Sequence, residues 1–304
     1  MLEILSTIAP VFLIIALGAV IRALRLADER WVDTLNKLGL YVAFPALIFS
    51  SLTSMDSAQQ ALDYRLFFIN AGILAAIMLL ILIISWMGGI RAQLRNTYLL
   101  CAIFGNVAYI GLPYISSALP GSEGNVSLIA ASYLAIVFTL GLIILEVSIK
   151  GNRHAMKVLE HILKNPLLIA VILGLLVAQY RIPLPVFFTS TVKMLAVGAS
   201  PLVLLALGIF LVKKLRFDRD MAHAAFMTAL KLAALPFLFI LVSRSLLGEI
   251  SFTIPIIEAG MPVAVTVFAL SEKYPLEKTM IMYAIIISTV LSAITLPLLT
   301  WVVG

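Results

Sequence analysis

Two ionisable side chains lie inside long apolar stretches of this 304-residue sequence, where a charge is costly to place. Glu258 follows the apolar residues 252–257, and Lys231 lies near the middle of the apolar residues 221–246. In a membrane, such residues commonly mark paths for ions or protons. Each residue also has a simpler interpretation. Glu258 could lie near the outer interface and be solvated there, and the Lys231 side chain could snorkel to the cytoplasmic surface.

Glycine, proline and polar residues interrupt two of the apolar stretches at similar depth. In one stretch Gly105 loosens the helix, Asn106 offers a donor and an acceptor, and Pro113 removes a backbone N–H. In the other, Gly260 and Pro262 bracket a predicted break. Broken helices expose N–H ends that favour anions and carbonyl ends that bind a cation or proton-bearing partner. The alternative is two proline-kinked helices without a ligand.

The composition requires that lipid cover much of the chain. Hydrophobic residues make up 62% of it and charged residues only 12%, against about half and a quarter in soluble domains. The single cysteine, Cys101, excludes an internal disulfide and a multi-thiolate metal site. No P-loop or hydrolase motif is present, so we expect a protein that is not an enzyme and that has no cofactor and no metal site.

The apolar runs predict an all-α polytopic membrane protein of about ten transmembrane helices. The N-terminus has its apolar residues before Arg22 and Arg25, which is typical of an uncleaved span and not of a signal peptide. The predicted spans are residues 4–24, 33–53, 65–88, 96–118, 126–149, 162–180, 189–212, 221–246, 252–271 and 278–303.

The basic residues between these spans predict the orientation of the chain. Of the 21 lysines and arginines, 16 fall in one set of alternating loops and four in the other, and the last is Lys231. Because cytoplasmic loops are enriched in Lys and Arg, both termini are expected on the outer side of an inner membrane. The net charge of +6 is therefore a topology signal, and nucleic acid is not expected as a partner.

An internal duplication is predicted from the odd number of spans on each side of the most basic loop. This cytoplasmic loop, residues 150–165, separates a first five-helix repeat, residues 1–149, from a second, residues 166–304. With five spans in each, the second repeat enters the membrane from the opposite side, which is a common transporter architecture. Proline motifs at Pro45 and Pro201 lie in corresponding spans and favour this interpretation.

Four motifs in order along the chain resemble the auxin efflux carrier family, which includes plant PIN proteins and bacterial carriers similar to malonate transporters. The resemblance covers the whole chain and is carried by residues 36–49, 106–113, 258–274 and 292–298. It implies two inverted five-helix repeats, as in bile-acid transporters and sodium–proton antiporters, with broken helices four and nine crossed at the substrate site. It also implies small carboxylate substrates and an elevator-like movement of a core against a scaffold.

Two residues depart from the plant members of the family. Gly105 stands before Asn106 where those proteins have proline, which indicates a looser break. Glu258 stands where they have glutamine. An ionisable group beside the crossed helices could couple transport to protons or sodium, whereas the plant mechanism is uncoupled.

The function predicted is secondary transport of a small organic anion, a mono- or dicarboxylate that is auxin-like or malonate-like. Glu258 and Lys231 are the candidates for coupling or an ion pair. The bilayer and, by resemblance, a second copy in a homodimer are the other expected partners. A carboxylate sensor without transport and a passive channel are the alternatives. The predicted substrate-binding residues are Gly105, Asn106, Tyr109, Pro262 and Val263, lined by Pro45, Ile48 and Phe49.

Overall fold

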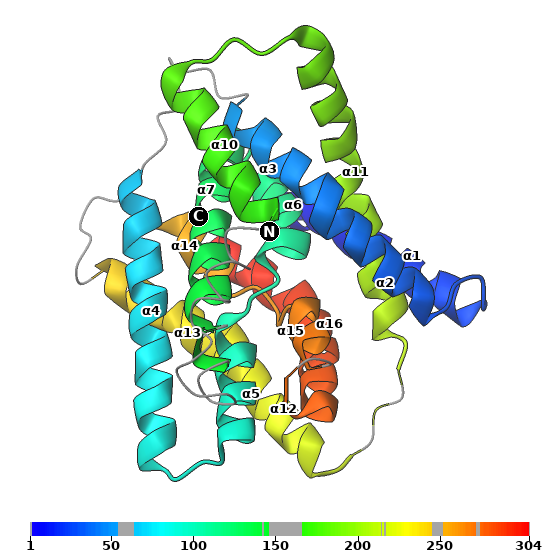
Figure 1. Ribbon diagram of the computed structural model, residues 1–304. Coiled ribbons are helices and arrows are strands. Elements are labelled where there is room, and N and C mark those ends of the chain that lie inside the picture. The colour runs from blue at the N-terminus through cyan, green and yellow to red at the C-terminus, as the bar shows by residue number, and fades with distance from the viewer. Residues whose placement is uncertain are drawn as a thin grey trace.

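The computed structural model describes residues 2–53, 64–141, 143–145, 166–213, 215, 217–244, 252–271 and 274–303. Within these ranges the backbone is helical and contains no strand, apart from one isolated β-bridge. The predicted cytoplasmic loop, residues 150–165, lies outside the described residues. The protein is therefore all-α in its described part (Figure 1).

The helices begin and end close to the predicted apolar segments, and several segments consist of two or three helical pieces in succession. Short π-helical turns, labelled η, join α-helical pieces. In chain order the elements are α1 (Leu2–Ala23), α2 (Glu29–Leu38), η1 (Gly39–Ala43), α3 (Phe44–Thr53), α4 (Tyr64–Met87), α5 (Ala92–Ile103), η2 (Val107–Gly111), α6 (Leu112–Ala118), α7 (Glu123–Ile136), η3 (Val137–Gly141), α10 (Pro166–Tyr180), α11 (Val186–Leu211), α12 (Arg219–Ala229), η5 (Leu230–Ala234), α13 (Leu235–Val242), α14 (Thr253–Ala259), α15 (Val265–Leu270) and α16 (Lys278–Val303).

Six described helical segments are long and apolar enough to cross a bilayer: Glu29–Thr53, Arg65–Met87, Glu123–Leu145, Val186–Leu211, Arg219–Val242 and Lys278–Val303. Three shorter apolar helices are Ala9–Ala23, Val107–Ala118 and Pro166–Tyr180. The predicted ninth span consists of the short helices α14 and α15 with a break between them. The chain is thus a multi-pass membrane protein.

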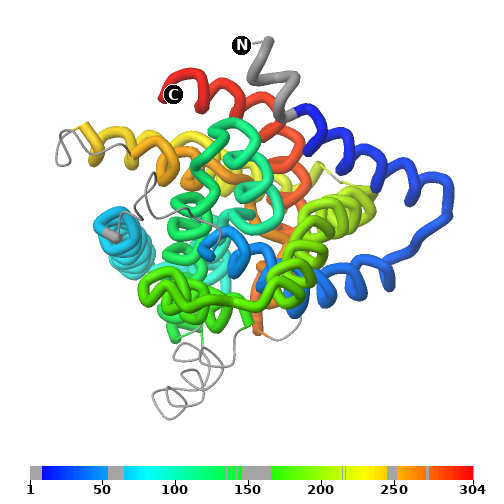
Figure 2. The backbone as a smooth tube through the Cα atoms, turned by 90° about the horizontal axis from the view of Figure 1, so that it is seen from above, coloured from blue at the N-terminus to red at the C-terminus, as the bar shows by residue number. Residues whose placement is uncertain are grey.

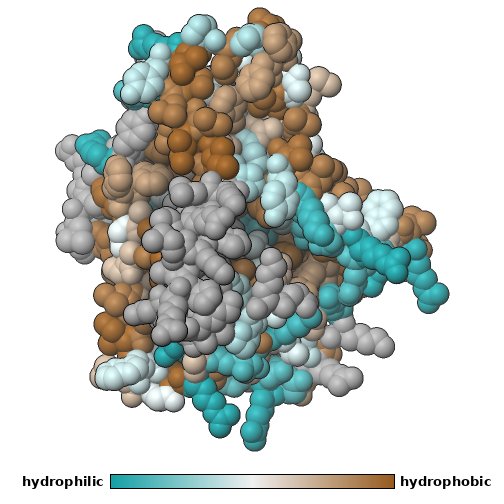
Figure 3. Space-filling view, viewed as in Figure 1, coloured by the Kyte–Doolittle hydropathy of each residue, from teal (hydrophilic) through white to brown (hydrophobic). Residues whose placement is uncertain are grey.

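Large apolar side chains cover the outside of these helices. Exposed examples occur on α4, α11 and α16, and include Trp86, Met87, Phe187, Val197 and Ile294. Figure 3 shows apolar side chains over much of one face, with hydrophilic side chains gathered toward its lower right. A soluble monomer rarely exposes apolar surface on this scale, so lipid is the expected neighbour.

The described helices pack as two bundles. Bundle A contains α1, α2, η1, α3, α10 and α11, and bundle B contains the remaining helices from α4 to α7 and from α12 to α16. Figure 2 shows α1 and α2 on the opposite side of the molecule from α4, so the bundles lie side by side. Their contacts include those of α3 and α10 with α7, those of α1 with α6 and α16, and that of α11 with η2.

Glycines permit the closest packing in bundle A. A Cβ atom at Gly208 of α11 would clash with the carbonyl oxygen of Ile15 and would lie 2.8 Å from the Gly18 Cα atom of α1. In a membrane such small residues matter, because helices there associate mainly through close packing. The Gly18–Gly208 contact therefore explains why α1 and α11 approach so closely.

Candidate functional site

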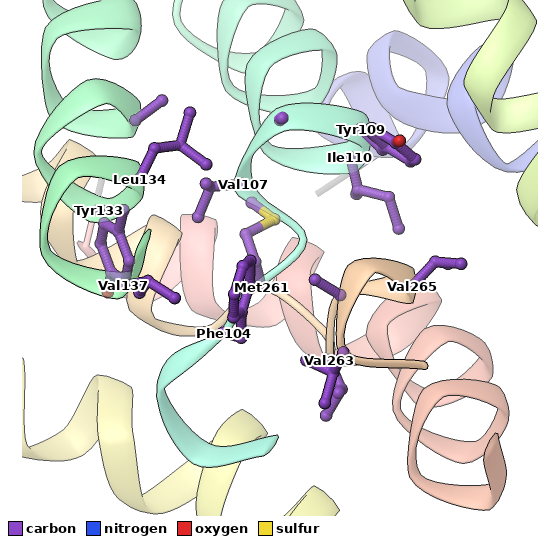
Figure 4. Close-up of a cluster of buried hydrophobic side chains, with 14 of the residues drawn as sticks. Phe104, Val107, Tyr109, Ile110, Tyr133, Leu134, Val137, Met261, Val263 and Val265 are labelled. Atoms are coloured by element: carbon purple, nitrogen blue, oxygen red, sulfur yellow. The ribbon is translucent and has the colours of Figure 1, made fainter. Parts of the chain in front are cut away.

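The two predicted helix interruptions meet inside bundle B. The Asn106 N–H donates to the Pro262 carbonyl oxygen at 2.7 Å, and the Ala264 N–H donates to the Phe104 carbonyl oxygen at 2.9 Å. These bonds enclose an antiparallel bridge between Gly105 and Val263. We call residues 104–106 and 260–264 the junction. Figure 4 shows the two non-helical stretches of chain passing each other, with Phe104 close to Met261.

The pairing of the two breaks answers a physical requirement. Backbone groups released from a helix in a bilayer must find partners inside the protein, because lipid offers none. Here each interrupted segment supplies partners for the other, and the Val263 N–H donates to the Ser288 hydroxyl oxygen of α16 at 3.0 Å. Backbone hydrogen-bonding groups of the junction therefore find partners on α16 as well as on the two interrupted segments.

Asn106 keeps a free donor at the junction. Its side chain is 3% exposed, and its Nδ2 atom has no hydrogen-bond partner among the described residues. The backbone carbonyl oxygen of Asn106 accepts from the N–H groups of Ile110 and Gly111. These bonds begin the helix Val107–Ala118. A buried amide donor without a partner costs about 1–3 kcal/mol, so a hydrogen-bond acceptor brought there would be favoured.

The Lys231 side chain reaches the junction from η5. It is 0% exposed, and its ammonium donates a 2.7 Å hydrogen bond to the Ala259 carbonyl oxygen at the end of α14. A Cβ atom at Gly105 would lie 3.0 Å from Lys231 Nζ, so the ammonium lies directly against that glycine. Of the two interpretations given above for Lys231, snorkelling to the cytoplasmic surface is wrong, because the helices of bundle B enclose the side chain.

Glu258 is buried beside the same junction. Its exposure is 0%, so the interpretation of a solvated carboxylate at the outer interface is also wrong. Neither carboxylate oxygen has a hydrogen-bond partner among the described residues. Glu258 interacts electrostatically with Lys231 and with Tyr133 of α7, whose buried hydroxyl has no partner among the described residues either. Glu258 of α14, Lys231 of η5 and Tyr133 of α7 thus bring polar groups to one buried place.

The other predicted site residues divide between the junction and bundle A. Tyr109 is buried in η2, and its ring stacks on Phe44 of α3 with 5.0 Å between centroids. This stack joins the two bundles. Ile48 is fully buried in α3, whereas Pro45 beside Phe44 is half-buried. Phe49 packs edge-on against Phe188 of α11 and lines a different cavity, described below.

The predicted helix-breaking residues have different roles. Gly260 follows the last residue of α14, and a Cβ atom there would lie 2.6 Å from the Leu299 side chain. Pro262 supplies the carbonyl that Asn106 contacts. Pro113 lies in the first turn of α6, where the backbone is helical on both sides, so the interruption precedes it at residues 104–106.

Two cavities lie outside the junction. One, of about 220 Å³, is an open pocket lined by residues of α2, the end of α11 and α15, so it lies between the bundles. Lys213 there pairs with Glu29 at 3.2 Å and lies over the Phe268 ring, 4.9 Å from its centroid. The other, of about 270 Å³, lies within bundle A and is lined by Phe49, Ser50, Thr53, Val177, Ile182, Leu184, Thr189, Val192 and Lys193.

Sequence reasoning did not single out several residues of this place as functional. Ser288, Tyr133, Phe44 and Ala259 all contact the junction residues or their neighbours. Ser288 is one of several serines and threonines in an apolar helix, and Ala259 acts only through its carbonyl. Phe44 carried the best signal, since it directly precedes Pro45. Within the described residues no group of three or more His, Cys, Asp or Glu side chains could hold a metal ion.

An all-helical multi-pass membrane fold with paired helix interruptions and buried charges is typical of membrane transporters. A family model described as "Membrane transport protein" matches residues 3–300, and the chain belongs to this family, that of the auxin efflux carriers. Its members are transporters and not enzymes. The resemblance seen in the sequence motifs is thereby confirmed.

Two archaeal relatives match along almost the full length. An uncharacterized transporter of Methanothermobacter thermautotrophicus is 27% identical over 312 residues, which is 96% of each chain. An uncharacterized transporter of Methanocaldococcus jannaschii is 22% identical over 303 residues, again 96% of each chain. The protein is a membrane transporter that handles a small substrate in a lipid bilayer.

Proposed function

We propose that this transporter is a secondary carrier for a small carboxylate, which binds at the junction. The observation that carries the proposal is the free Nδ2 donor of Asn106, buried at the start of the helix Val107–Ala118. The N-terminal end of a helix carries a partial positive charge and free N–H groups, which favour an anion. The ammonium of Lys231 adds a full positive charge to the same place.

Side chains from both bundles would line the site. Gly105, Pro262 and Val263 shape the junction, and Tyr109 of η2 stacks on Phe44 of α3, the helix that also carries Pro45 and Ile48. Phe49 of the same helix packs against Phe188 and away from Tyr109. A carboxylate at Asn106 would have its organic part directed toward α3. Small-molecule sites commonly combine such an apolar lining with a few fixed polar groups.

The packing of the helices supports two inverted five-helix repeats with crossed helices four and nine. The most extensive contacts in bundle A pair α1 with α11 and α10 with α3, so the first span of each repeat packs on the second span of the other. In bundle B, α4 packs on α7 as α12 packs on α16, the third span on the fifth in both cases. A twofold-related duplication produces such matched pairs.

Glycines on the first spans support the same duplication. Gly18 of α1 lies against α11, and Gly174 of α10 lies against Leu52 of α3. Including the interrupted and shorter helices, the chain would make ten crossings. The distribution of lysine and arginine favours an inner membrane with both termini outside.

Alternating access would occur by movement of bundle B against bundle A, in the manner of an elevator. The cavity of about 220 Å³ between α2, α11 and α15 lies on the boundary that such a movement would change. So does the stack of Tyr109 on Phe44. A boundary that carries a hollow has room for one bundle to move against the other, whereas the junction itself is held by hydrogen bonds within bundle B.

Glu258 is the proposed coupling group. With Glu258 ionised, its negative charge balances the positive charge of Lys231, and an arriving anion leaves an excess negative charge in a buried place. If Glu258 takes up one proton with each monovalent anion, the loaded site becomes neutral again. Avoiding an unpaired buried charge favours this stoichiometry.

Thermal unfolding of the purified protein with added carboxylates tests the function. Malonate, malate, succinate and indole-3-acetate would be added singly over pH 5–8. A ligand that binds only the folded protein raises the melting temperature in proportion to the logarithm of its concentration. We expect such a rise with at least one carboxylate and not with the matching amide or alcohol. No rise with any acid of a broad panel would contradict the proposal.

A further inference from the structure

We infer that the Lys231 ammonium is a resident cation of the junction, which occupies the carbonyl end of α14 where a metal cation would otherwise bind. The inference deepens the proposed function, because it concerns the coupling of the same site. A carrier whose cation is a side chain needs no sodium for anion binding.

The first step is the place of the ammonium on the backbone. The last carbonyls of a helix carry partial negative charge, and in broken transporter helices these ends coordinate sodium. At the end of α14, the carbonyls of Ile256, Ile257 and Glu258 accept from the N–H groups of Gly260 and Met261. The next carbonyl, that of Ala259, accepts instead from Lys231 Nζ at 2.7 Å.

The second step is the enclosure of the charge. Lys231 is fully buried and belongs to η5, a π-helical turn, which is a backbone form often found at functional sites. Its Nζ atom lies 5.9 Å from the centroid of the Tyr133 ring. A positive charge over an aromatic ring is stabilised without any counter-ion from solution. Glu258 supplies the opposite charge nearby.

The third step is the fit of the opposing segment. Gly105 leaves room for the ammonium, since a Cβ atom there would lie 3.0 Å from Nζ and 3.2 Å from Cε of Lys231. The ammonium therefore contacts both interrupted segments, α14 through a hydrogen bond and residues 104–106 through van der Waals contact. A metal ion could not share this space with it.

The experiment measures melting temperature in detergent without any carboxylate, in sodium, lithium, ethylammonium or choline chloride at one ionic strength. The wild type is expected to melt at the same temperature in all four salts. Lys231→Ala leaves the Ala259 carbonyl open to a small cation, so sodium or ethylammonium should raise its melting temperature by about 2–4 °C over choline, which is too bulky to enter. Lys193→Ala, at an exposed lysine of α11, should behave as the wild type.

Two results would overturn the inference. One is a wild-type protein that sodium stabilises over choline, since the site would then be open to a metal. The other is a well-folded Lys231→Ala variant that responds to none of the small cations. If that variant does not fold, Lys231→Met decides, because it keeps an apolar side chain of similar length and still removes the ammonium from the Ala259 carbonyl, which should also make the melting temperature sensitive to small cations. Since no carboxylate is present, these outcomes do not depend on whether the proposed substrate class is right.

Discussion

The backbone N–H of Asn106 donates a 2.7 Å hydrogen bond to the Pro262 carbonyl oxygen, so two helix breaks from opposite halves of the sequence hold each other. This bond and its neighbour from Ala264 to Phe104 fix the relative position of the segments. As a consequence, the groups around the junction are expected to move together and not independently when bundle B moves.

Removing the hydroxyl of Ser288 should loosen the junction. In Ser288→Ala the Val263 N–H loses its acceptor in a buried place, which costs about 1–3 kcal/mol. We expect a lower melting temperature in detergent. Ser292→Ala is the matched control, because within the described part of the chain the Ser292 hydroxyl bonds only to the Thr289 carbonyl of its own helix. An equal loss in both variants would mean that the bond to Val263 has no special weight.

Glu258→Gln should remove the part of the pH dependence of anion binding that arises from Glu258. If Glu258 takes up a proton when the anion binds, the wild type binds more tightly as pH falls, because the protonated form is favoured at low pH. Glutamine resembles the protonated acid, so the variant should keep only the pH dependence that comes from ionisation of the ligand itself.

The affinity of both proteins for the carboxylate found by thermal unfolding would be measured by calorimetry from pH 5 to 8. Glu123→Gln, at an exposed glutamate in the first turn of α7, serves as the control and should follow the wild type. A Glu258→Gln variant that keeps the wild-type pH profile would exclude Glu258 from coupling.

Packing in bundle A should be sensitive to any side chain at position 208. In Gly208→Ala the added methyl group meets backbone atoms of Ile15 and Gly18, which cannot turn away as a side chain can. The loss of stability is expected at about 1–3 kcal/mol, as for other overpacked sites. Gly198→Ala in the same helix should be well tolerated, since the nearest atom is 3.7 Å away on Leu202. Melting temperatures of the two variants check this order.

The sequence predicted the helical segments well because the signal is local. An apolar run by itself indicates a helix that must be covered by lipid or protein. The breaks at Gly105 and Gly260 are predicted because glycine and proline change the backbone at their own positions. The pairing of these breaks depends on the approach of two distant segments. No local pattern carries that information, and only the family resemblance indicated it.

The positions of the buried charges were beyond local reasoning for the same reason. A lysine in the middle of a span can extend to the membrane surface or stay buried, and the sequence around it does not distinguish these two cases. The side chain of Lys231 remains inside because Ala259 supplies an acceptor and Gly105 supplies space. Both depend on packing of the junction against η5. For Phe49, the α-helical rotation from Phe44 directs it to bundle A and away from Tyr109.

Uptake of a radiolabelled carboxylate into proteoliposomes tests the central claim most directly, with wild type compared to Asn106→Ala. Gln179→Ala, at an exposed amide on α10, is the control and should transport as the wild type does. Loss of a hydrogen bond to a charged substrate predicts a fall in uptake of about tenfold or more in Asn106→Ala at low substrate concentration. Equal uptake by Asn106→Ala and the wild type would contradict the account.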